Sequence, residues 1–396
     1  MKKASQAYDR FLDQLPAQRR RSLRAFGKTN GSRIERAGRV LCNFSSNNYL
    51  GLAQHPALRE RAVEWTETWG TSSGASRLVC GNLELFERVE AKLAAAKHKE
   101  TALILASGYQ TNASVLAALL NPRILEADPL VYSDTLNHAS IHQGCRAAGI
   151  RQIPYHHNDL DHLESLLRED EHEKRPRFIL TESVFSMDGD RVDIEQLVGI
   201  ADKYGAFLYL DEAHATGVLG PDGFGLATGY GDRIDLVMGT FSKALGSFGG
   251  YVACSAKLRD FLVTRCPGLI YSTGLPPAIL GANDAALDLV PQMTAERAWL
   301  EGATEHVRQG FRDLGLDIGP STTQIIPVIV GAEETALRMS SALEESGILG
   351  VAIRPPTVPE GKSRIRFAVT AAHNDADLDW LIASTVQTAR ELSVLP

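Results

Sequence analysis

Short β-type runs alternate with helical stretches from about residue 100 to residue 255, and this alternation constrains the fold more than any other feature. It is the signature of βαβ units built around a mainly parallel sheet. Several runs are apolar without alternation, as expected of strands that helices cover on both faces. We therefore predict an α/β fold with a mainly parallel central sheet, and we expect its strands at 102–106, 130–133, 177–181, 206–210, 236–239 and 250–254.

Helices are expected where apolar residues recur at helical spacing. Leu85, Val89 and Leu93 fall on one face of a helix at about 83–96, and a similar pattern begins at Leu160. After Pro276-Pro277 the texture changes. A long helical stretch at 279–314 leads into a strand at 325–330, a helix near 334–345 and a final strand near 364–369.

These elements predict three parts of the chain. Residues 1–45 form a helical or extended N-terminal segment, residues 46–285 form a large α/β domain, and residues 286–396 form a small α+β domain. The whole resembles the layered architectures in which each sheet face is buried by helices.

Composition and charge exclude several classes of protein. The net charge of −7 and the pI near 5.9 argue against a nucleic-acid-binding or membrane-surface protein. The chain lacks an apolar run of the roughly 18 residues that would span a bilayer, and residues 1–16 lack a secretory signal. Most of the basic run at Arg19, Arg20, Arg21 and Arg24 is interpreted as the solvated face of an N-terminal helix.

The cysteines indicate the compartment. Five of them are scattered along the chain, without a CxxC pair. This pattern is typical of buried thiols in a reducing environment and differs from a disulfide framework or a zinc site. We therefore expect a cytoplasmic protein.

Asp211 and Lys243 carry the strongest chemical signal. Asp211 directly follows the run at 207–210, so it lies at the carboxyl end of a buried strand, where open α/β sheets bind ligands. A carboxylate there is costly unless it meets a cation, and a pyridinium nitrogen is such a cation. Lys243 follows the buried strand at 236–239. A desolvated lysine has a lowered pKa and can form an imine with a carbonyl group.

Each of these residues also has a purely structural interpretation. Asp211 could cap a helix, His214 could be a hydrogen-bonded core histidine, and a serine–lysine pair alone carries little meaning. Their occurrence together, at strand ends and in this order, favours the functional interpretation. The combination predicts a pyridoxal phosphate enzyme in which the protonated cofactor ring acts as an electron sink.

The phosphate of that cofactor needs donors. Gly108-Tyr109 opens a helix directly after a strand, so free backbone N–H groups face the crevice, and Thr240 and Ser242 add hydroxyl groups. A serine–glycine pair before a helix is also a common turn. His138 follows another strand and could stack on the cofactor ring, or it could be a capping or core histidine.

Longer motifs give a resemblance. Residues 43–51 (NFSSNNYLG), 211–217 (DEAHATG), 240–246 (TFSKALG), 271–277 (YSTGLPP) and 354–359 (RPPTVP) occur in this order. The chain resembles, from about residue 15 onward, the α-oxoamine synthase family of fold-type I pyridoxal phosphate enzymes. Residues 352–359 followed by 370–373 (TAAH) are similar to the biotin-pathway branch of that family.

The resemblance implies roles for individual residues. Lys243 would bind the cofactor covalently and shuttle the substrate α-proton, Asp211 would pair with the pyridine nitrogen, and His214 would hydrogen-bond the phenolic oxygen. The remaining cofactor contacts would come from His138, stacked on the ring, and from Gly108, Tyr109, Ser186, Thr240 and Ser242.

Substrate and partner contacts are implied in the same way. Arg354 would hold the substrate carboxylate with the help of Asn47, which agrees with the bidentate geometry of a planar guanidinium. Thr357 and an arginine of the N-terminal helix, best matched by Arg24, would line the acyl-thioester site. Ser272 and Thr273 would reach the phosphate of a neighbouring subunit, which implies a homodimer with shared active sites.

Some residues depart from the family pattern. Asn48 stands where an aspartate is expected, and Arg77 and Cys80 lie in a segment, 74–81, whose counterparts vary. These departures leave the acyl donor open. They do not affect the expected cofactor chemistry.

Other possible sites in the sequence have simpler explanations. His156, His157, His162 and His172 suggest a metal site, but a solvated surface explains them better, and we expect no metal. Neither a GxGxxG motif after a strand nor a GxSxG elbow is present, so nicotinamide binding and α/β-hydrolase chemistry lack support.

The resemblance implies a decarboxylative condensation of L-alanine with a pimeloyl thioester, carried either by coenzyme A or by acyl carrier protein. Three alternatives remain. One is a member of the same family that takes glycine, serine or another acyl chain. Another is a catalytically silent partner subunit, and a third is an aminotransferase or aldolase on the same fold.

Overall fold

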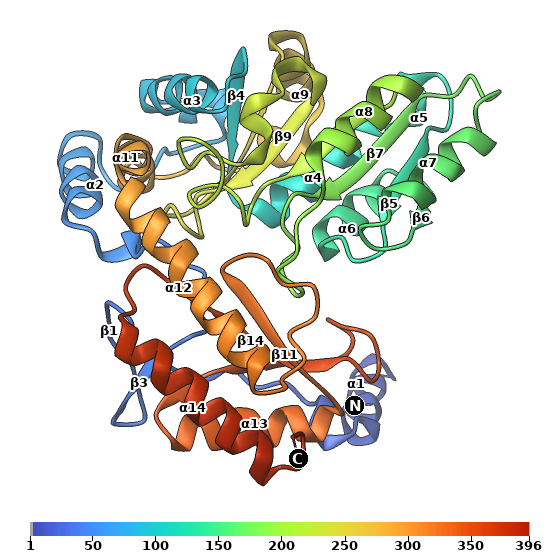
Figure 1. Cartoon of the computed structure of the whole chain (residues 1–396). Helices are drawn as coiled ribbons and strands as arrows, with labels where there is room; N and C mark the ends of the chain where they lie inside the picture. The colour runs from blue at the N-terminus through green and yellow to red at the C-terminus, as the bar shows by residue number, and fades with distance from the viewer. Residues whose placement is uncertain (1–2, 396) are drawn as a thin grey trace. The chain divides into compact units, whose positions relative to one another are not determined.

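The computed structural model of the chain describes residues 3–395, apart from the side chain of Ala17. Met1, Lys2 and Pro396, which the expected terminal parts include, lie outside the described residues. The chain divides into two compact units, shown in Figure 1. The large unit comprises residues 47–186 and 190–299, and the small unit comprises residues 1–46, 187–189 and 300–396.

A seven-stranded sheet forms the centre of the large unit. Its order is β4-β10-β9-β8-β7-β5-β6, and only β10 runs antiparallel to its neighbours. The predicted α/β class with a mainly parallel sheet is confirmed. The strands are β4 (Thr101–Leu105), β5 (Leu130–Asp134), β6 (Ile153–Tyr155), β7 (Arg177–Glu182), β8 (Phe207–Asp211), β9 (Leu236–Thr240) and β10 (Gly250–Cys254).

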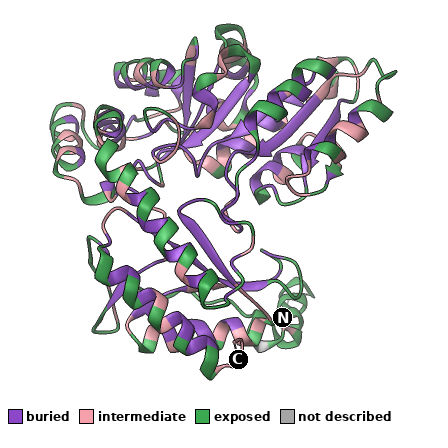
Figure 2. Ribbon diagram, in the orientation of Figure 1, coloured by how far each residue is buried: buried purple, intermediate pink, exposed green. Residues whose placement is uncertain are grey.

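Helices cover both faces of this sheet because alternate strand residues point to opposite sides. On one face Leu180 and Tyr209 pack in a buried cluster with residues of α4 (Gly108–Leu119), α6 (Ala139–Ala147), α9 (Ala256–Arg265) and α10 (Pro267–Ile270). On the other face Ile179 and Leu210 pack with α7 (Leu160–Glu169) and α8 (Ile194–Tyr204). The strands are consequently buried along most of their length (Figure 2).

Three further helices of the large unit pack together: α2 (Pro56–Trp69), α3 (Glu84–Ala96) and α11 (Pro277–Leu289). The predicted helix at 83–96 is confirmed. The short α5 (Pro122–Leu125) lies between β4 and β5 in sequence. The expectation of one helical stretch over 279–314 is wrong. α11 ends before a 3₁₀ turn that contains Pro291, and α12 (Thr294–Asp313) begins after it, because proline lacks the N–H that a helix interior requires.

The small unit combines both ends of the chain. β3 (Arg39–Asn43) pairs with β12 (Ile348–Leu349) in parallel, and this pairing places the N-terminal segment in one unit with the C-terminal residues. The remaining elements are α1 (Lys3–Gln14), β1 (Thr29–Asn30), β2 (Arg33–Arg36), β11 (Ile325–Gly331), α13 (Glu333–Glu345), β13 (Val351–Ile353), β14 (Ser363–Ala368) and α14 (Asp375–Glu391).

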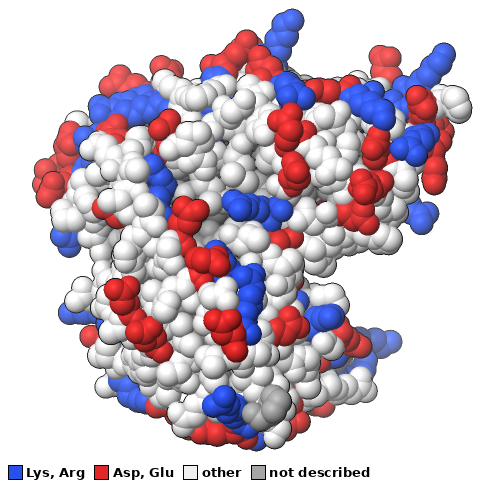
Figure 3. Space-filling view, viewed as in Figure 1, with Lys and Arg blue, Asp and Glu red and all other residues white. Residues whose placement is uncertain are grey.

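The surface carries charges of both signs. On the face shown in Figure 3, acidic and basic side chains are interspersed. Within residues 3–395, no helix has the length and apolar character that crossing a bilayer requires.

Candidate active site

Lys243 begins a series of hydrogen bonds that connects four polar side chains. It follows the end of β9 by three residues, and its Nζ lies 2.8 Å from Nε2 of His214. Nδ1 of His214 in turn lies 2.8 Å from the hydroxyl of Tyr49, which donates a hydrogen bond to Oδ1 of Asn47 at 3.1 Å. A phenol has one proton, so with that proton on the Asn47 side the Nδ1–H of His214 donates to Tyr49. Nε2 of His214 then accepts a hydrogen bond from Lys243.

Asp211 ends β8 and is almost fully buried. Its carboxylate accepts hydrogen bonds from two neutral donors, the side-chain amide of Asn112 and the backbone N–H of Ala213, each at 2.8 Å. A buried carboxylate that neutral donors hold in place gains further from a nearby cation. The protonated pyridine nitrogen of pyridoxal phosphate is a cation that fits this requirement.

Asn112 also connects Asp211 to His138. Its amide nitrogen donates to Oγ of Ser140 at 2.9 Å, and that hydroxyl lies 2.6 Å from Nδ1 of His138. The hydroxyl of Tyr209 fixes the other end of the amide at 2.6 Å. Sequence reasoning missed Asn112 and Ser140. Gln110, Thr111 and Ser114 are also polar, so the local sequence of α4 does not single out Asn112.

His138 caps α6, because Nδ1 accepts the backbone N–H of Ser140 at 3.3 Å. The capping interpretation is therefore confirmed, and stacking on the cofactor ring stays a prediction. Burial lowers the pKa of His138, the positive charge of Lys243 acts in the same direction, and Asp211 opposes them. The ring is thus neutral near pH 7, as stacking on an aromatic cofactor requires. Tyr109 meets it edge-on, with 6.3 Å between the ring centroids.

The buried Glu182 contacts the backbone of His138. Its carboxylate accepts the backbone N–H of His138 at 2.6 Å, and its position in β7 is opposite Asp211 in β8. Burial raises the pKa of Glu182 well above its ordinary value, and the neighbouring Asp211 adds to the effect. Glu182 therefore holds a proton more readily than an ordinary glutamate does.

The start of α4 and the end of β9 form an anion cradle. Ser107 caps the helix by accepting the N–H of Gln110, so the N–H groups of Gly108 and Tyr109 belong to the first turn, which lacks intrahelical partners. The hydroxyl of Thr240 lies 2.7 Å from that of Ser242. A methyl group added to Gly108 would approach the Thr240 side chain to 3.5 Å, so both donor sets face one space. Amide and hydroxyl donors of this kind fit a phosphate.

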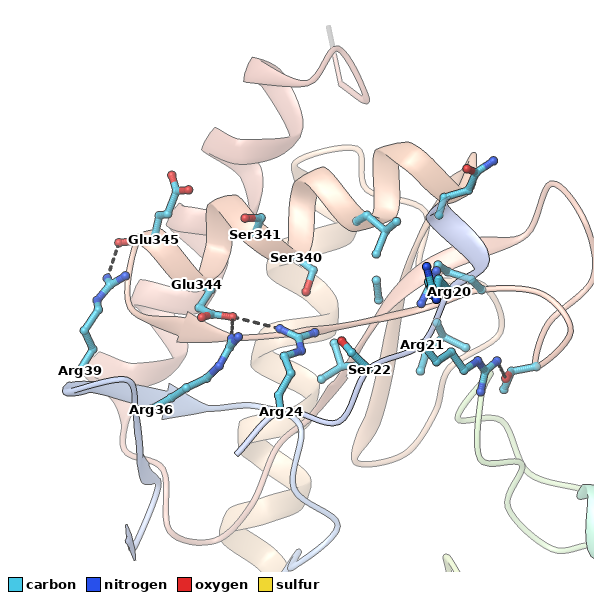
Figure 4. A pocket seen from close by; sticks show the side chains of 17 residues that line it. Arg20, Arg21, Ser22, Arg24, Arg36, Arg39, Ser340, Ser341, Glu344 and Glu345 are labelled. Atoms are coloured by element: carbon cyan, nitrogen blue, oxygen red, sulfur yellow. Dashed lines mark hydrogen bonds and ion pairs between the residues drawn. The ribbon is translucent and has the colours of Figure 1, made fainter. Parts of the chain in front are cut away.

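In the small unit, Arg24, Arg354 and Thr357 line a pocket of about 650 Å³ (Figure 4). Arg24 forms an ion pair with Glu344 at 3.3 Å, and Arg36 forms another with the same carboxylate. Further basic residues on the wall are Arg20, Arg21 and Arg39. The pocket is therefore rich in positive charge that its acidic residues only partly neutralise.

The expectation that Arg24 lies on a helix is wrong. α1 ends at Gln14, a single 3₁₀ turn follows at Ala17–Arg19, and residues 20–28 form neither helix nor strand. Pro16 explains the break, because it disfavours helical geometry in the residue before it. Arg21 donates a hydrogen bond to Oγ1 of Thr357 at 3.2 Å, so this irregular segment forms a side of the pocket.

Comparison with known proteins agrees with this site. Residues 39–384 match the aminotransferase class I and II family. A putative 8-amino-7-oxononanoate synthase of Magnetococcus marinus is 57% identical over 373 residues, which cover 94% of each chain. The 8-amino-7-oxononanoate synthase of Gluconacetobacter diazotrophicus is 57% identical over 365 residues, or 92% of each chain.

The chain belongs to the α-oxoamine synthase family.

Solved structures agree with this membership. Sphingomonas wittichii serine palmitoyltransferase has a TM-score of 0.90 at 25% identity, covering 100% of this chain and 98% of its own. The S. paucimobilis enzyme, solved with a bound PLP–myriocin aldimine, has a TM-score of 0.88 at 25% identity over 94% of both chains. The chain is a pyridoxal-phosphate-dependent acyltransferase of the 8-amino-7-oxononanoate synthase type, and the predicted cofactor is confirmed.

Other residues singled out by the α-oxoamine synthase motifs lie close to this cradle. The hydroxyl of Ser272 accepts a hydrogen bond from Gln110 of α4 at 2.6 Å, and Thr273 forms an isolated bridge with Ser76. Ser186 follows β7 on the sheet edge that carries Asp211. Tyr49 lies in the motif at 43–51, but the motif by itself did not indicate a role for it.

The histidine-rich segment has a structural explanation. His157 lies 3.0 Å from Asp134 and 3.1 Å from Asp190, apart from the other histidines. His156, Asp159 and His162 approach one another closely enough to share an ion. However, Nδ1 of His162 accepts the backbone N–H of His156 at 3.0 Å, which leaves the proton of the neutral ring on Nε2. Both nitrogens are thus engaged or protonated, and we propose no metal site there.

Proposed function

We propose that the chain condenses L-alanine with a pimeloyl thioester and releases 8-amino-7-oxononanoate, CO₂ and the free thiol carrier, a step of biotin biosynthesis. The contact that carries this proposal is the 2.8 Å approach of Lys243 Nζ to His214, at the same sheet edge as the buried Asp211. An amine and a carboxylate so placed suit a cofactor-dependent reaction at an amino acid. The relatives of 57% identity support the choice of substrates.

Bound pyridoxal phosphate supplies an electron sink for the negative charge that forms at the α-carbon of the amino acid. Asp211 keeps the pyridine nitrogen protonated, and His138 packs against the ring. His214 directs Nε2 toward the phenolic oxygen. The phosphate is held by the cradle of Gly108, Tyr109, Thr240 and Ser242, with Ser186 close by.

Lys243 moves the proton. Its Nζ removes the α-proton of alanine and returns a proton after CO₂ has left, as general acid–base catalysis by a positioned amine requires. While Lys243 is a free amine, its hydrogen bond to Nε2 of His214 holds Nζ at this sheet edge.

Four side chains make the proposed contacts with the two substrates. Arg354 holds the carboxylate of alanine with the help of Asn47, and Thr357 and Arg24 line the acyl-thioester site. The arginine-rich wall of the pocket suits an anionic donor, since both coenzyme A and the phosphopantetheine of acyl carrier protein carry phosphate. Arg20 and Arg21 are on this wall and extend the positive charge.

Assembly and location are part of the proposal. Ser272 and Thr273 reach the phosphate of a second copy, so the enzyme acts as a homodimer with shared active sites. Burial raises the pKa of the Cys145 and Cys254 thiols to about 12, so both stay protonated and inert. Unreactive thiols are consistent with a cytoplasmic location of the enzyme.

The test is an assay of the purified holoenzyme with L-alanine and either pimeloyl-coenzyme A or pimeloyl-acyl carrier protein. We expect stoichiometric release of thiol and CO₂ with at least one donor, and the faster donor identifies the carrier. Glycine or serine in place of alanine, and acyl chains of graded length, test the substrate choice. Absence of both thiol and CO₂ with alanine and either donor would contradict the proposal.

A further inference from the structure

Glu212, the residue after Asp211, forms a buried ion pair with Lys97, and the reaction as proposed does not use it. Nζ of Lys97 lies 2.9 Å from Oε2 of Glu212, and both side chains are completely buried. The same ammonium donates to Oγ1 of Thr216 at 2.9 Å and to the backbone carbonyl of Phe224 at 2.5 Å. All three of its N–H donors therefore have an acceptor.

The carboxylate of Glu212 is equally well satisfied. Its second oxygen accepts the backbone N–H groups of Leu226 at 2.6 Å and Ala227 at 2.9 Å. Burial opposes the charge of Lys97, but the carboxylate of Glu212 outweighs it, so the pKa of Lys97 is raised. The pair is thus a fixed salt bridge with directional bonds on both sides.

This pair holds the turn that carries the site residues. Glu212 follows Asp211 directly and precedes His214 by two residues. Its backbone N–H donates to the carbonyl of Met238 in β9, and its carbonyl accepts the N–H groups of Ala215 and Thr216. A displacement of the Glu212 side chain would therefore move the residues on both sides of it.

Close packing also restricts the turn 211–217. Gly217 has φ +95°, and a methyl group there would collide with Ala244, the neighbour of Lys243. A methyl group on Gly225 would collide with the carboxylate of Glu212. The turn 211–217 is consequently fixed between the loop at 220–227 and the residues that follow Lys243.

Stability alone does not require an ion pair here. A buried pair is often no more stabilising than apolar side chains of similar volume, because desolvation offsets the attraction between the charges. An apolar pair would lack the five directional hydrogen bonds found here. Three of them are accepted by the Glu212 carboxylate, and the other two hold the Lys97 ammonium that binds it.

We propose that Lys97 and Glu212 are positioning residues, which hold the turn 211–217 so that Asp211 and His214 meet the cofactor ring in the geometry that the reaction needs. The inference rests on the proposed roles of Asp211 and His214. Neither Lys97 nor Glu212 touches the cofactor or the substrates.

The test replaces the pair by neutral side chains of similar size, Lys97→Met with Glu212→Gln, which avoids leaving one buried charge unpaired. We expect the pH at which the absorbance of the bound cofactor titrates to shift by about one unit. We also expect kcat to fall at least about tenfold, because small misplacements of reacting groups slow catalysis strongly, while the KM for L-alanine changes little. The overturning result is a cofactor titration and a kcat equal to those of the wild type, whatever the melting temperature.

The matched control is Asp284→Asn. Asp284 is also a fully buried carboxylate with basic partners, Arg61, Arg88 and Lys92, but it lies among the helices α2, α3 and α11. This variant should lower the melting temperature and leave the cofactor titration unchanged. If it shifts the titration as far as the double variant does, loss of stability explains both and the proposal fails.

A milder change covers the case in which the double variant does not fold. Thr216→Val removes one acceptor of Lys97 and leaves the ion pair intact. It should shift the cofactor titration in the same direction by a smaller amount, and an unchanged titration would again overturn the proposal. Failure of the proposed function is distinguishable, since it would leave the wild-type holoenzyme itself without thiol or CO₂ release.

Discussion

At the scale of single residues, the position of one hydroxyl proton decides which nitrogen of His214 is protonated. With the proton of Tyr49 directed to Asn47, His214 presents an unprotonated Nε2 to Lys243. If the hydroxyl turns toward Nδ1 instead, Nε2 carries the proton and can donate to an oxygen. By turning its hydroxyl group, Tyr49 therefore allows Nε2 of His214 either to accept a hydrogen bond, as from Lys243, or to donate one to an oxygen.

Tyr49→Phe tests this role. We expect a loss of about 1–3 kcal/mol in the free energy of unfolding, because Nδ1 of the buried His214 loses this partner. The measurement is urea unfolding of the apoprotein. Tyr8→Phe is the control, since Tyr8 is 70% exposed on α1. Equal small losses in both variants would show that the Tyr49 hydroxyl contributes nothing to His214.

Lys243→Ala tests the covalent attachment of the cofactor. Borohydride reduction should fix the cofactor to the wild type and leave the variant unlabelled. Turnover should fall by at least about 10²–10⁴-fold, the usual contribution of a positioned proton-transfer group. Lys257→Ala, an exposed lysine on α9, should behave as the wild type. Covalent labelling of the Lys243→Ala protein would contradict the assignment.

The sequence was informative about residues at strand ends and uninformative about contacts between distant segments. Asp211 and Lys243 follow apolar runs, so their placement at one sheet edge could be predicted. Tyr49 reaches His214 across 165 residues, and Asn112 reaches Asp211 across 99. Neither contact leaves a local pattern, because each depends on packing that only the folded chain creates.

At the scale of secondary structure elements, His157, which follows β6, connects the end of β5 with the segment after β7. Its ring nitrogens lie 3.0 Å from Asp134, at the end of β5, and 3.1 Å from Asp190. Burial alone would lower the pKa of His157. The two carboxylates outweigh that effect and raise the pKa to about 10.

This raised pKa predicts a dependence of stability on pH. The ordinary pKa of histidine is about 6.5. The contribution of His157 is therefore full below about pH 6.5 and is lost as the pH rises through the folded value of about 10. Urea unfolding from neutral pH up to about pH 10 should show a steeper decline for the wild type than for His157→Asn. Parallel declines would contradict the predicted charge on His157.

The start of α14 offers a second test at this scale. Asn374 forms a capping box with Asp377, in which each side chain accepts the backbone N–H of the other. Asn374→Ala should cost about 1 kcal/mol of unfolding free energy, since one N–H of the first turn loses its acceptor. Urea unfolding measures it. Asn374→Asp should restore most of the loss, and failure to do so would exclude capping as the cause.

Elements with a long, consistent pattern were predictable, and short or interrupted ones were not. The predicted strand at 250–254 and the helix near 334–345 match β10 and α13 closely. β6 was missed because it has only three residues and contains Pro154. Pro291 interrupts the helical stretch predicted over 279–314, so the backbone restriction of proline prevailed over helical spacing there.

At the scale of the whole molecule, apolar side chains gather on the large unit near the cofactor cradle. The helical turn Arg77–Gly81 exposes Leu78 and Val79, and the bridge between Ser76 and Thr273 brings it close to the exposed Tyr271. Exposed apolar patches of this kind mark interaction surfaces. A second copy of the chain is the partner that the proposed shared site requires.

Val79→Asp should weaken this self-association. A charge buried against an apolar surface is unfavourable, so we expect the dimer dissociation constant to rise at least about tenfold, or about 1.4 kcal/mol. Sedimentation over a range of protein concentrations measures it. Val63→Asp, at an exposed position of α2, is the control and should leave the constant unchanged. A Val79→Asp dimer as tight as the wild type would exclude this surface.

The pairing of β3 with β12 has a consequence for synthesis on the ribosome. β3 ends at Asn43, but its partner begins only at Ile348, so the N-terminal strand emerges long before the strand that completes its sheet. At about 5–20 residues per second, this interval is roughly 15–60 s. The large unit, whose residues 47–299 emerge within that time, can fold first. The edge of β3 that faces away from β2 must therefore stay unpaired, and open to chaperones, until translation is nearly finished.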